Sequence, residues 1–160
     1  MKMLLKCILV LAIIVLAVNA YSDEKRHIYS SWDIMEIDTC ASAWLIKRFV
    51  DEGAEFKFYP KGEFITEGIP FDTPDAELRR RHGMSTFENI AAKYKIDDRG
   101  VVKMGKIVHE IEINYWGPRL DNEAKKISES IKRIIVESGN PAECLEKSFI
   151  VLDDFYREIE

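Results

Sequence analysis

The sequence lacks the short motifs that mark many catalytic and nucleotide-binding sites. It contains no G-x-S-x-G nucleophile elbow, no P-loop, no Rossmann glycine pattern and no H-E-x-x-H helix. None of its three cysteines belongs to a C-x-x-C pair, so a zinc ribbon or a thioredoxin-like redox motif has no support. No internal repeat, low-complexity stretch or linker divides the chain, and we therefore expect one domain.

The first 20 residues have the charge and hydropathy pattern of a secretory signal peptide. Lys2 and Lys6 precede an apolar run over 7–18, and the small residue Ala20 follows it. As a helix this run spans roughly 18 Å, which is too short for the roughly 30 Å core of a bilayer. An uncleaved anchor is the alternative. We expect cleavage after Ala20 and export of a mature domain, residues 21–160, to the periplasm or the medium, with no stable membrane insertion.

The charge balance limits the partners of the mature chain. Removal of Lys2 and Lys6 changes the formal net charge from −5 to −7. An acidic surface disfavours nucleic acid, which requires clustered lysine and arginine, so we expect no nucleic-acid partner. Cys40 and Cys144 remain after cleavage. In an oxidising compartment they can form a disulfide, but their separation in sequence does not imply one.

Hydropathy patterns predict a helix-dominated α+β fold, with a small β element packed against a cluster of about four to five helices. Asp38 and Thr39 can cap the first helix, and Ser85 with Glu88 forms a capping box for the second. A long loop over 61–83, with a helical turn after its Thr-Pro pair, is of the length that often serves function. The predicted strands are 27–35 and 55–59, and the predicted helices are 41–52, 85–94, 98–115, 120–134 and 140–156.

His109 and Glu112 form the most specific local signal for chemistry. They lie three residues apart on one helical face, at the edge of the apolar stripe, where an imidazole and a carboxylate can bind a metal or orient a water. A histidine hydrogen-bonded to a carboxylate, with no ligand, is the simpler interpretation. His82 and Asp72 lie in the long loop and can complete a metal site. The arginine run 79–81 in this loop can instead cradle an oxyanion.

A further cluster is predicted on the first helix. Trp44, Arg48 and Asp51 lie at i, i+4 and i+7, so that the guanidinium can lie over the indole and the carboxylate can hold it. Such a cluster is more often a structural clasp than an anion site.

Several motifs, taken in order, resemble the C-terminal domain of the chromate-resistance ChrB family. The resemblance covers nearly the whole mature chain. The motifs are DTCASAWLIKRFVD at 38–51, AEF at 54–56, IPFD at 69–72, HGMSTFE at 82–88, IVHEIE at 107–112 and LDDFY at 152–156. The family usually has Asp where Glu112 stands and often Cys where Ser85 stands, so the resemblance carries over the carboxylate but no cysteine chemistry at that position.

The resemblance implies an exported accessory protein of the chromate or metal-stress response, because the chain is similar to the stand-alone exported members of the family. The leading hypothesis is a binding protein for a metal ion or oxyanion. Its cofactor is undefined, although a divalent transition metal would suit the ligands, which are predicted to be His82, His109, Glu112 and Asp72. Asp38, Trp44 and Arg48 would form a supporting or anion-binding shell. A metal-dependent hydrolase or oxidoreductase, and an interaction module for a membrane transporter, are the alternatives.

Overall fold

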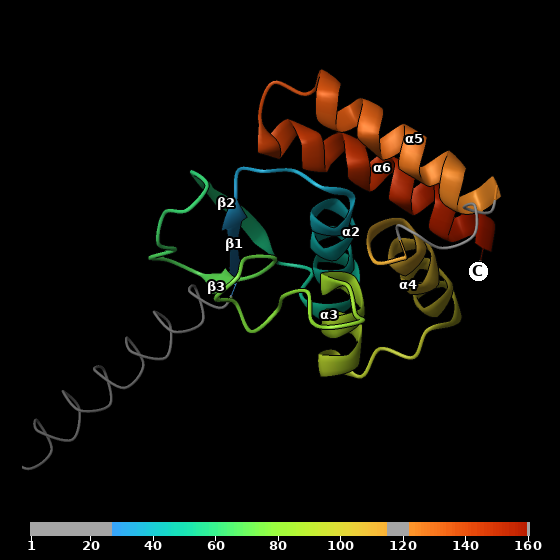
Figure 1. Cartoon of the computed structure of the whole chain (residues 1–160), viewed down its shortest axis with the longest axis horizontal. Coiled ribbons are helices and arrows are strands. Elements are labelled where there is room, and N and C mark those ends of the chain that lie inside the picture. Colours follow the sequence, from blue (N-terminus) through green and yellow to red (C-terminus); the bar gives the residue numbers. More distant parts are fainter. Residues whose placement is uncertain (1–26, 115–121, 160) are drawn as a thin grey trace, which may run out of the picture.

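The computed structural model describes residues 27–114 and 122–159 (Figure 1). The predicted signal peptide and its cleavage site lie outside the described residues. The elements are β1 (Ile28–Trp32), α2 (Ile37–Leu45), the π-helical turn η1 (Ile46–Val50), β2 (Glu55–Tyr59), β3 (Ile69–Pro70), α3 (Thr86–Tyr94), α4 (Arg99–Glu112), α5 (Asn122–Glu137) and α6 (Pro141–Ile159). The predicted helix-dominated α+β fold is confirmed.

The strands form one small parallel sheet in the order β2-β1-β3. Parallel neighbours require a crossover, and α2 with η1 provides it between β1 and β2. Gly68 brings β3 close to β1: its φ is +82°, and a Cβ there would lie 2.6 Å from the carbonyl oxygen of Ile28. The predicted strand 55–59 has the observed bounds of β2, whereas β1 is shorter than the predicted 27–35.

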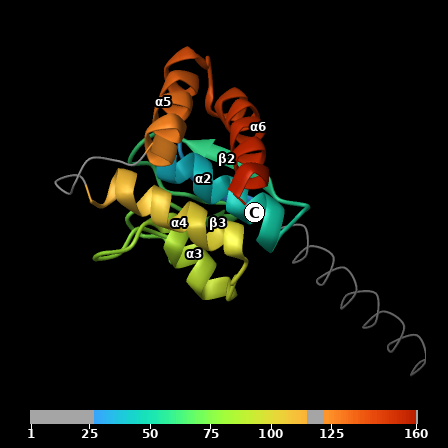
Figure 2. The same cartoon turned by 90° about the vertical axis from the view of Figure 1, so that its right-hand side faces the viewer.

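The prediction that Asp38 and Thr39 cap the first helix was wrong. α2 begins at Ile37 with Glu36 at the N-cap position, so both residues lie inside its first turn. All of α2 is buried, because it runs through the centre of the molecule between the sheet and the other helices (Figures 1 and 2). A buried first turn places a carboxylate and a hydroxyl where they can contact other elements.

The remaining helices pack around α2. Ser85 and Glu88 form the predicted capping box of α3, with both reciprocal hydrogen bonds present. Asp98 caps α4, and the side chain of Asn140 accepts a hydrogen bond from the Glu143 amide at the start of α6. α5 and α6 form an antiparallel hairpin on one side of α2, while α3 and α4 lie on another (Figure 2).

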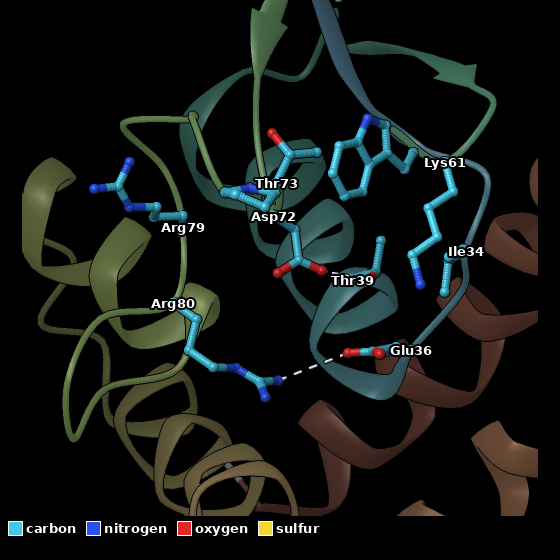
Figure 3. Close-up of a pocket in the computed structure, with 10 residues that line it drawn as sticks. Ile34, Glu36, Thr39, Lys61, Asp72, Thr73, Arg79 and Arg80 are labelled. Carbon is cyan, nitrogen blue, oxygen red and sulfur yellow. Dashed lines mark hydrogen bonds and ion pairs between the residues drawn. The ribbon is translucent and has the colours of Figure 1, made fainter. Parts of the chain in front are cut away.

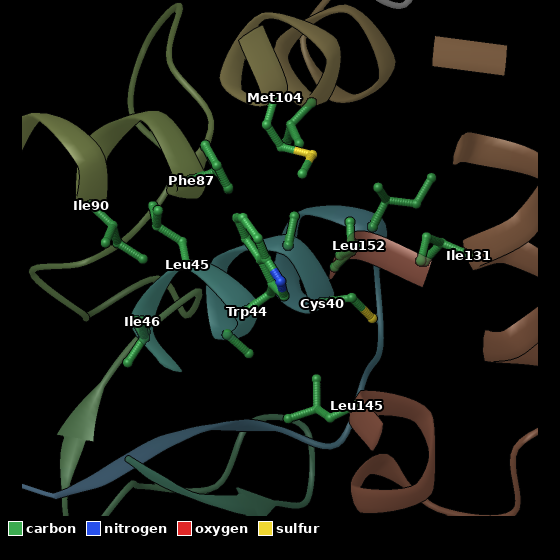
Figure 4. Packing of buried hydrophobic residues seen from close by; sticks show 14 of the residues in the cluster. Cys40, Trp44, Leu45, Ile46, Phe87, Ile90, Met104, Ile131, Leu145 and Leu152 are labelled. Atoms are coloured by element: carbon green, nitrogen blue, oxygen red, sulfur yellow. The ribbon is translucent and has the colours of Figure 1, made fainter. Parts of the chain in front are cut away.

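One hydrophobic core joins all of these elements. Trp44 and Leu45 of α2 and Ile46 of η1 are at most 1% exposed, and they meet Phe87 of α3 and Leu152 of α6 (Figure 4). Full burial of side chains this large contributes roughly 1.5–3 kcal/mol each. None of the described helices is long and apolar enough to cross a membrane.

Candidate functional site

A cavity of about 290 Å³ lies where the three strands end, and we call it the strand-end cavity (Figure 3). Each strand contributes residues at or after its carboxyl end. Ligands of parallel sheets commonly bind at this edge, because the loops that leave the strands converge there. The lining residues are Trp32 at the end of β1, Ile34 and Glu36 after it, Lys61 after β2, Asp72, Thr73, Pro74, Arg79 and Arg80 after β3, and Thr39 of α2.

Asp72 lines the cavity, and its carboxyl group is held by two hydroxyls. Thr86 Oγ1 donates to Asp72 Oδ1 at 2.6 Å, and Thr39 Oγ1 donates to Oδ2. Burial, together with the nearby charge of Asp38, raises the pKa of Asp72 to about 7 despite these hydrogen bonds. The backbone of Asp72 has a φ of 51°, a left-handed conformation that Asp and Asn tolerate. The cavity therefore contains a carboxyl group that changes charge near neutral pH.

The buried carboxylate of Asp38 joins α2 to α3. It is 0% exposed and accepts hydrogen bonds from the backbone amides of Thr86 at 2.8 Å and Phe87 at 2.9 Å. These amides belong to the first turn of α3, where a negative charge is stabilised by the helix dipole. Asp38 thus caps a helix other than its own, and it fixes Thr86 opposite Asp72.

Arg80 connects the cavity to α4. Its Nη2 atom lies 2.8 Å from Glu112 Oε2, 3.3 Å from Asp38 Oδ2 and 3.8 Å from Glu36 Oε2, the last contact being drawn in Figure 3. Burial alone would lower the pKa of Arg80, but the charges of Asp38 and Glu112 raise it. Burial in turn raises the pKa of Glu112, against the effect of Arg80. Glu112 therefore holds Arg80 beside the cavity.

The other two cations of the cavity are less constrained. Arg79 is exposed and donates from Nη1 to the carbonyl oxygen of Ala76 at 3.1 Å, and the Nζ of Lys61 makes no ion pair with any residue that the structure describes. Glu36 at the N-cap of α2 makes no side-chain capping hydrogen bond. The cavity thus combines two available cations with the amino end of a helix, a combination that favours an anion.

The four predicted metal ligands occupy separate places. His109 contacts Glu88 of the capping box at 2.9 Å, Glu112 binds Arg80, and His82 lies exposed in the loop. Of the four, Asp72 alone lines the strand-end cavity. Within residues 27–114 and 122–159, no three His, Cys, Asp or Glu side chains gather in an arrangement that could hold a metal ion.

The predicted partners of Arg48 were wrong. Its guanidinium binds Asp153 of α6 with two hydrogen bonds of 2.9 and 2.7 Å and lies over the ring of Phe149. The indole Nε1 of Trp44 donates to Asp153 as well, at 2.7 Å. Asp51 pairs with His27. Arg48 and Trp44 thus join α2 and η1 to α6, away from the strand-end cavity.

Sequence analysis missed Glu36, Lys61 and Thr39 as site residues. Lys61 lies two residues after one predicted strand, and Glu36 directly follows the other, so their positions at strand ends were the available signal. That signal becomes specific only once the strands are known to be parallel, because only then do their carboxyl ends meet at one edge.

Comparison with known proteins identifies the family. The sequence profile of the family described as "ChrB, C-terminal domain" matches residues 29–159. A curated relative, Protein ChrB of Cupriavidus metallidurans, is 28% identical over 79 residues, which are 48% of this chain and 24% of that protein. The matched region is thus about a quarter of the relative's length. No solved structure gives a significant match. Because the profile match covers most of the chain, the protein belongs to the ChrB C-terminal domain family.

Proposed function

We propose that this protein is an accessory protein of chromate resistance that binds a small oxyanion, with chromate as the candidate, in the strand-end cavity. The family suggests the role in chromate resistance. The observation that supports oxyanion binding is that Lys61, Arg79 and Arg80 all line one cavity of about 290 Å³.

The chemistry of the lining suits a tetrahedral oxyanion better than a metal cation. A guanidinium presents paired N–H donors to two oxygens of such an anion, and a lysine adds a point charge. The two carboxyl groups of the cavity oppose an anion only weakly, because Glu36 lies beside Arg80 and Asp72 can be neutral near pH 7. A metal would need a group of donor side chains, and the described residues offer no such group.

Titration calorimetry with chromate tests the proposal, and the arginine run supplies a matched control. Arg79 lines the cavity, whereas Arg81 contacts the carbonyl oxygen of Glu77 outside it. We expect Arg79→Gln to weaken chromate binding by about tenfold or more, because one charge-assisted contact contributes roughly 1.5–3 kcal/mol. Arg81→Gln should bind like the wild type. Equal effects of both variants, or no binding by the wild type, would contradict the proposal.

We further propose that the protein is exported and that its mature chain begins at Tyr21. The basis is the charged, apolar and small-residue pattern of the first 20 residues. N-terminal sequencing of the protein from its native host, combined with cell fractionation, tests this. A chain that keeps Met1 and stays in the membrane fraction would contradict it.

A further inference from the structure

Two cysteines distant in sequence meet in the core, away from the strand-end cavity. Cys40 of α2 and Cys144 of α6 are free thiols whose sulfur atoms lie 3.9 Å apart. They are 0% and 1% exposed, and Figure 4 shows Cys40 in the layer that also contains Trp44, Leu145 and Leu152. A disulfide needs an S–S distance of about 2.0 Å, so the two sulfur atoms must move about 2 Å closer for the bond to form.

The surroundings of the pair favour a thiolate on Cys144. The hydroxyls of Ser138 and Ser148 are buried without a conventional hydrogen-bond partner in the described part of the chain. Both lie close enough to Cys144 to influence the pKa of its thiol. The thiol of Cys40, together with these hydroxyls and the charge of Lys147, lowers the pKa of Cys144 to about 7 against the effect of burial. The hydrogen bond to Cys144, then burial, and more weakly the charge of Asp72 raise the pKa of Cys40.

A small molecule can approach Cys144 from one side. Cys144 lines a cavity of about 280 Å³ formed where α5 turns into α6, together with Ser138 and Asn140. Met35, which follows β1, also lines it. The cavity is large enough for a molecule the size of a peroxide, and Cys144 forms part of its wall.

We propose that Cys40 and Cys144 form a redox-active dithiol in which Cys144 attacks a small peroxide and Cys40 resolves the product to a disulfide. The Cys144 thiolate attacks one peroxide oxygen, the O–O bond breaks, and the departing hydroxide takes a proton to become water. Cys40 then gives up its proton and attacks the sulfenic sulfur of Cys144, and the S–O bond breaks to release a second water. The two thiols lose two electrons, and the peroxide gains them.

Peptide-resolved alkylation after exposure of the full chain to hydrogen peroxide tests this inference. Mass spectrometry should find the Cys40 and Cys144 peptides joined, with the loss of two hydrogens, and Cys7 is scored separately because its peptide differs. In Cys40→Ser, Cys144 should stop at a sulfenic acid that dimedone traps. In Cys144→Ser, Cys40 should react at least tenfold more slowly than in the wild type. An unreacted pair, or Cys40 oxidised equally fast in Cys144→Ser, would overturn the inference.

Ser148→Ala keeps the test independent of folding defects in the cysteine variants. It removes a buried hydroxyl without a conventional partner, so a merely structural role predicts no loss of stability and an unchanged oxidation rate. If the hydroxyl stabilises the Cys144 thiolate, the pH at which the oxidation rate reaches half its maximum should rise from about 7 by a few tenths or more. An unshifted rate profile would count against the proposed thiolate.

Discussion

Replacement of Asp72 by Asn isolates the energetic cost of one carboxylate in the strand-end cavity. Asn tolerates the left-handed backbone at this position, where φ is 51°, and its amide can still bond to the hydroxyls of Thr39 and Thr86. The substitution therefore removes the charge and changes little else.

The sign of the effect follows from the pKa of Asp72, which rises from an ordinary 3.8 to about 7 on folding. The folded protein holds this proton more tightly than the unfolded chain, so the resulting stability is fully present below about pH 4. It is lost as the pH rises through about 7. A rise of about three units corresponds to roughly 4 kcal/mol at most, because each unit is about 1.4 kcal/mol.

Urea unfolding of the wild type and Asp72→Asn at about pH 4.5 and about pH 8 measures this contribution to the free energy of unfolding. We expect Asp72→Asn to be more stable than the wild type by about 1–4 kcal/mol at the higher pH and similar at the lower one. Asp75→Asn, an exposed change in the same loop, controls for a general effect of charge. A less stable Asp72→Asn at high pH would mean that the carboxylate is favourable there, and the reasoning would fail.

Three further predictions concern other contacts. Asp153→Ala should lower the free energy of unfolding by about 1–3 kcal/mol, because it leaves the buried indole N–H of Trp44 without an acceptor, whereas Asp153→Asn should lose less in the same urea titration. His109→Ala should cost only about 1 kcal/mol, since Glu88 keeps its capping hydrogen bond, and a chelator should shift the melting temperature of neither protein; a chelator-sensitive wild type would restore the metal hypothesis. Sulfate, a dianion at both pH values, should bind more tightly at about pH 6 than at about pH 8 in calorimetry, because protonation removes the charge of Asp72; equal affinities would contradict this role.

Features set by neighbouring residues could be predicted from the sequence. The capping box of Ser85 and Glu88 spans three residues, and the strand over 55–59 shows its own alternation, so both were found. The apolar periodicity of the later helices was equally local. These signals were enough to predict the helix-dominated α+β class.

Features set by distant residues could not be predicted. Asp38 caps a helix that starts 48 residues later, and His109 meets a carboxylate 21 residues earlier, so no local spacing reveals either pair. The interpretation of His109 and Glu112 as joint ligands rested on their shared helical face. Both residues do lie on α4, but His109 contacts Glu88 of α3 and Glu112 binds Arg80 of the loop. The two-residue strand β3 is too short to show any alternation, so the sequence did not predict it. The parallel sheet edge that forms the cavity could therefore not be predicted either.

The central claim is that the strand-end cavity holds an oxyanion, and diffraction from crystals soaked in chromate tests it most directly, because chromium scatters anomalously. We expect a chromium peak in the cavity, placed so that the chromate oxygens lie within hydrogen-bond distance of the side chains of Arg79, Arg80 or Lys61. A peak elsewhere on the protein, or an empty cavity at chromate concentrations that saturate binding in solution, would contradict it.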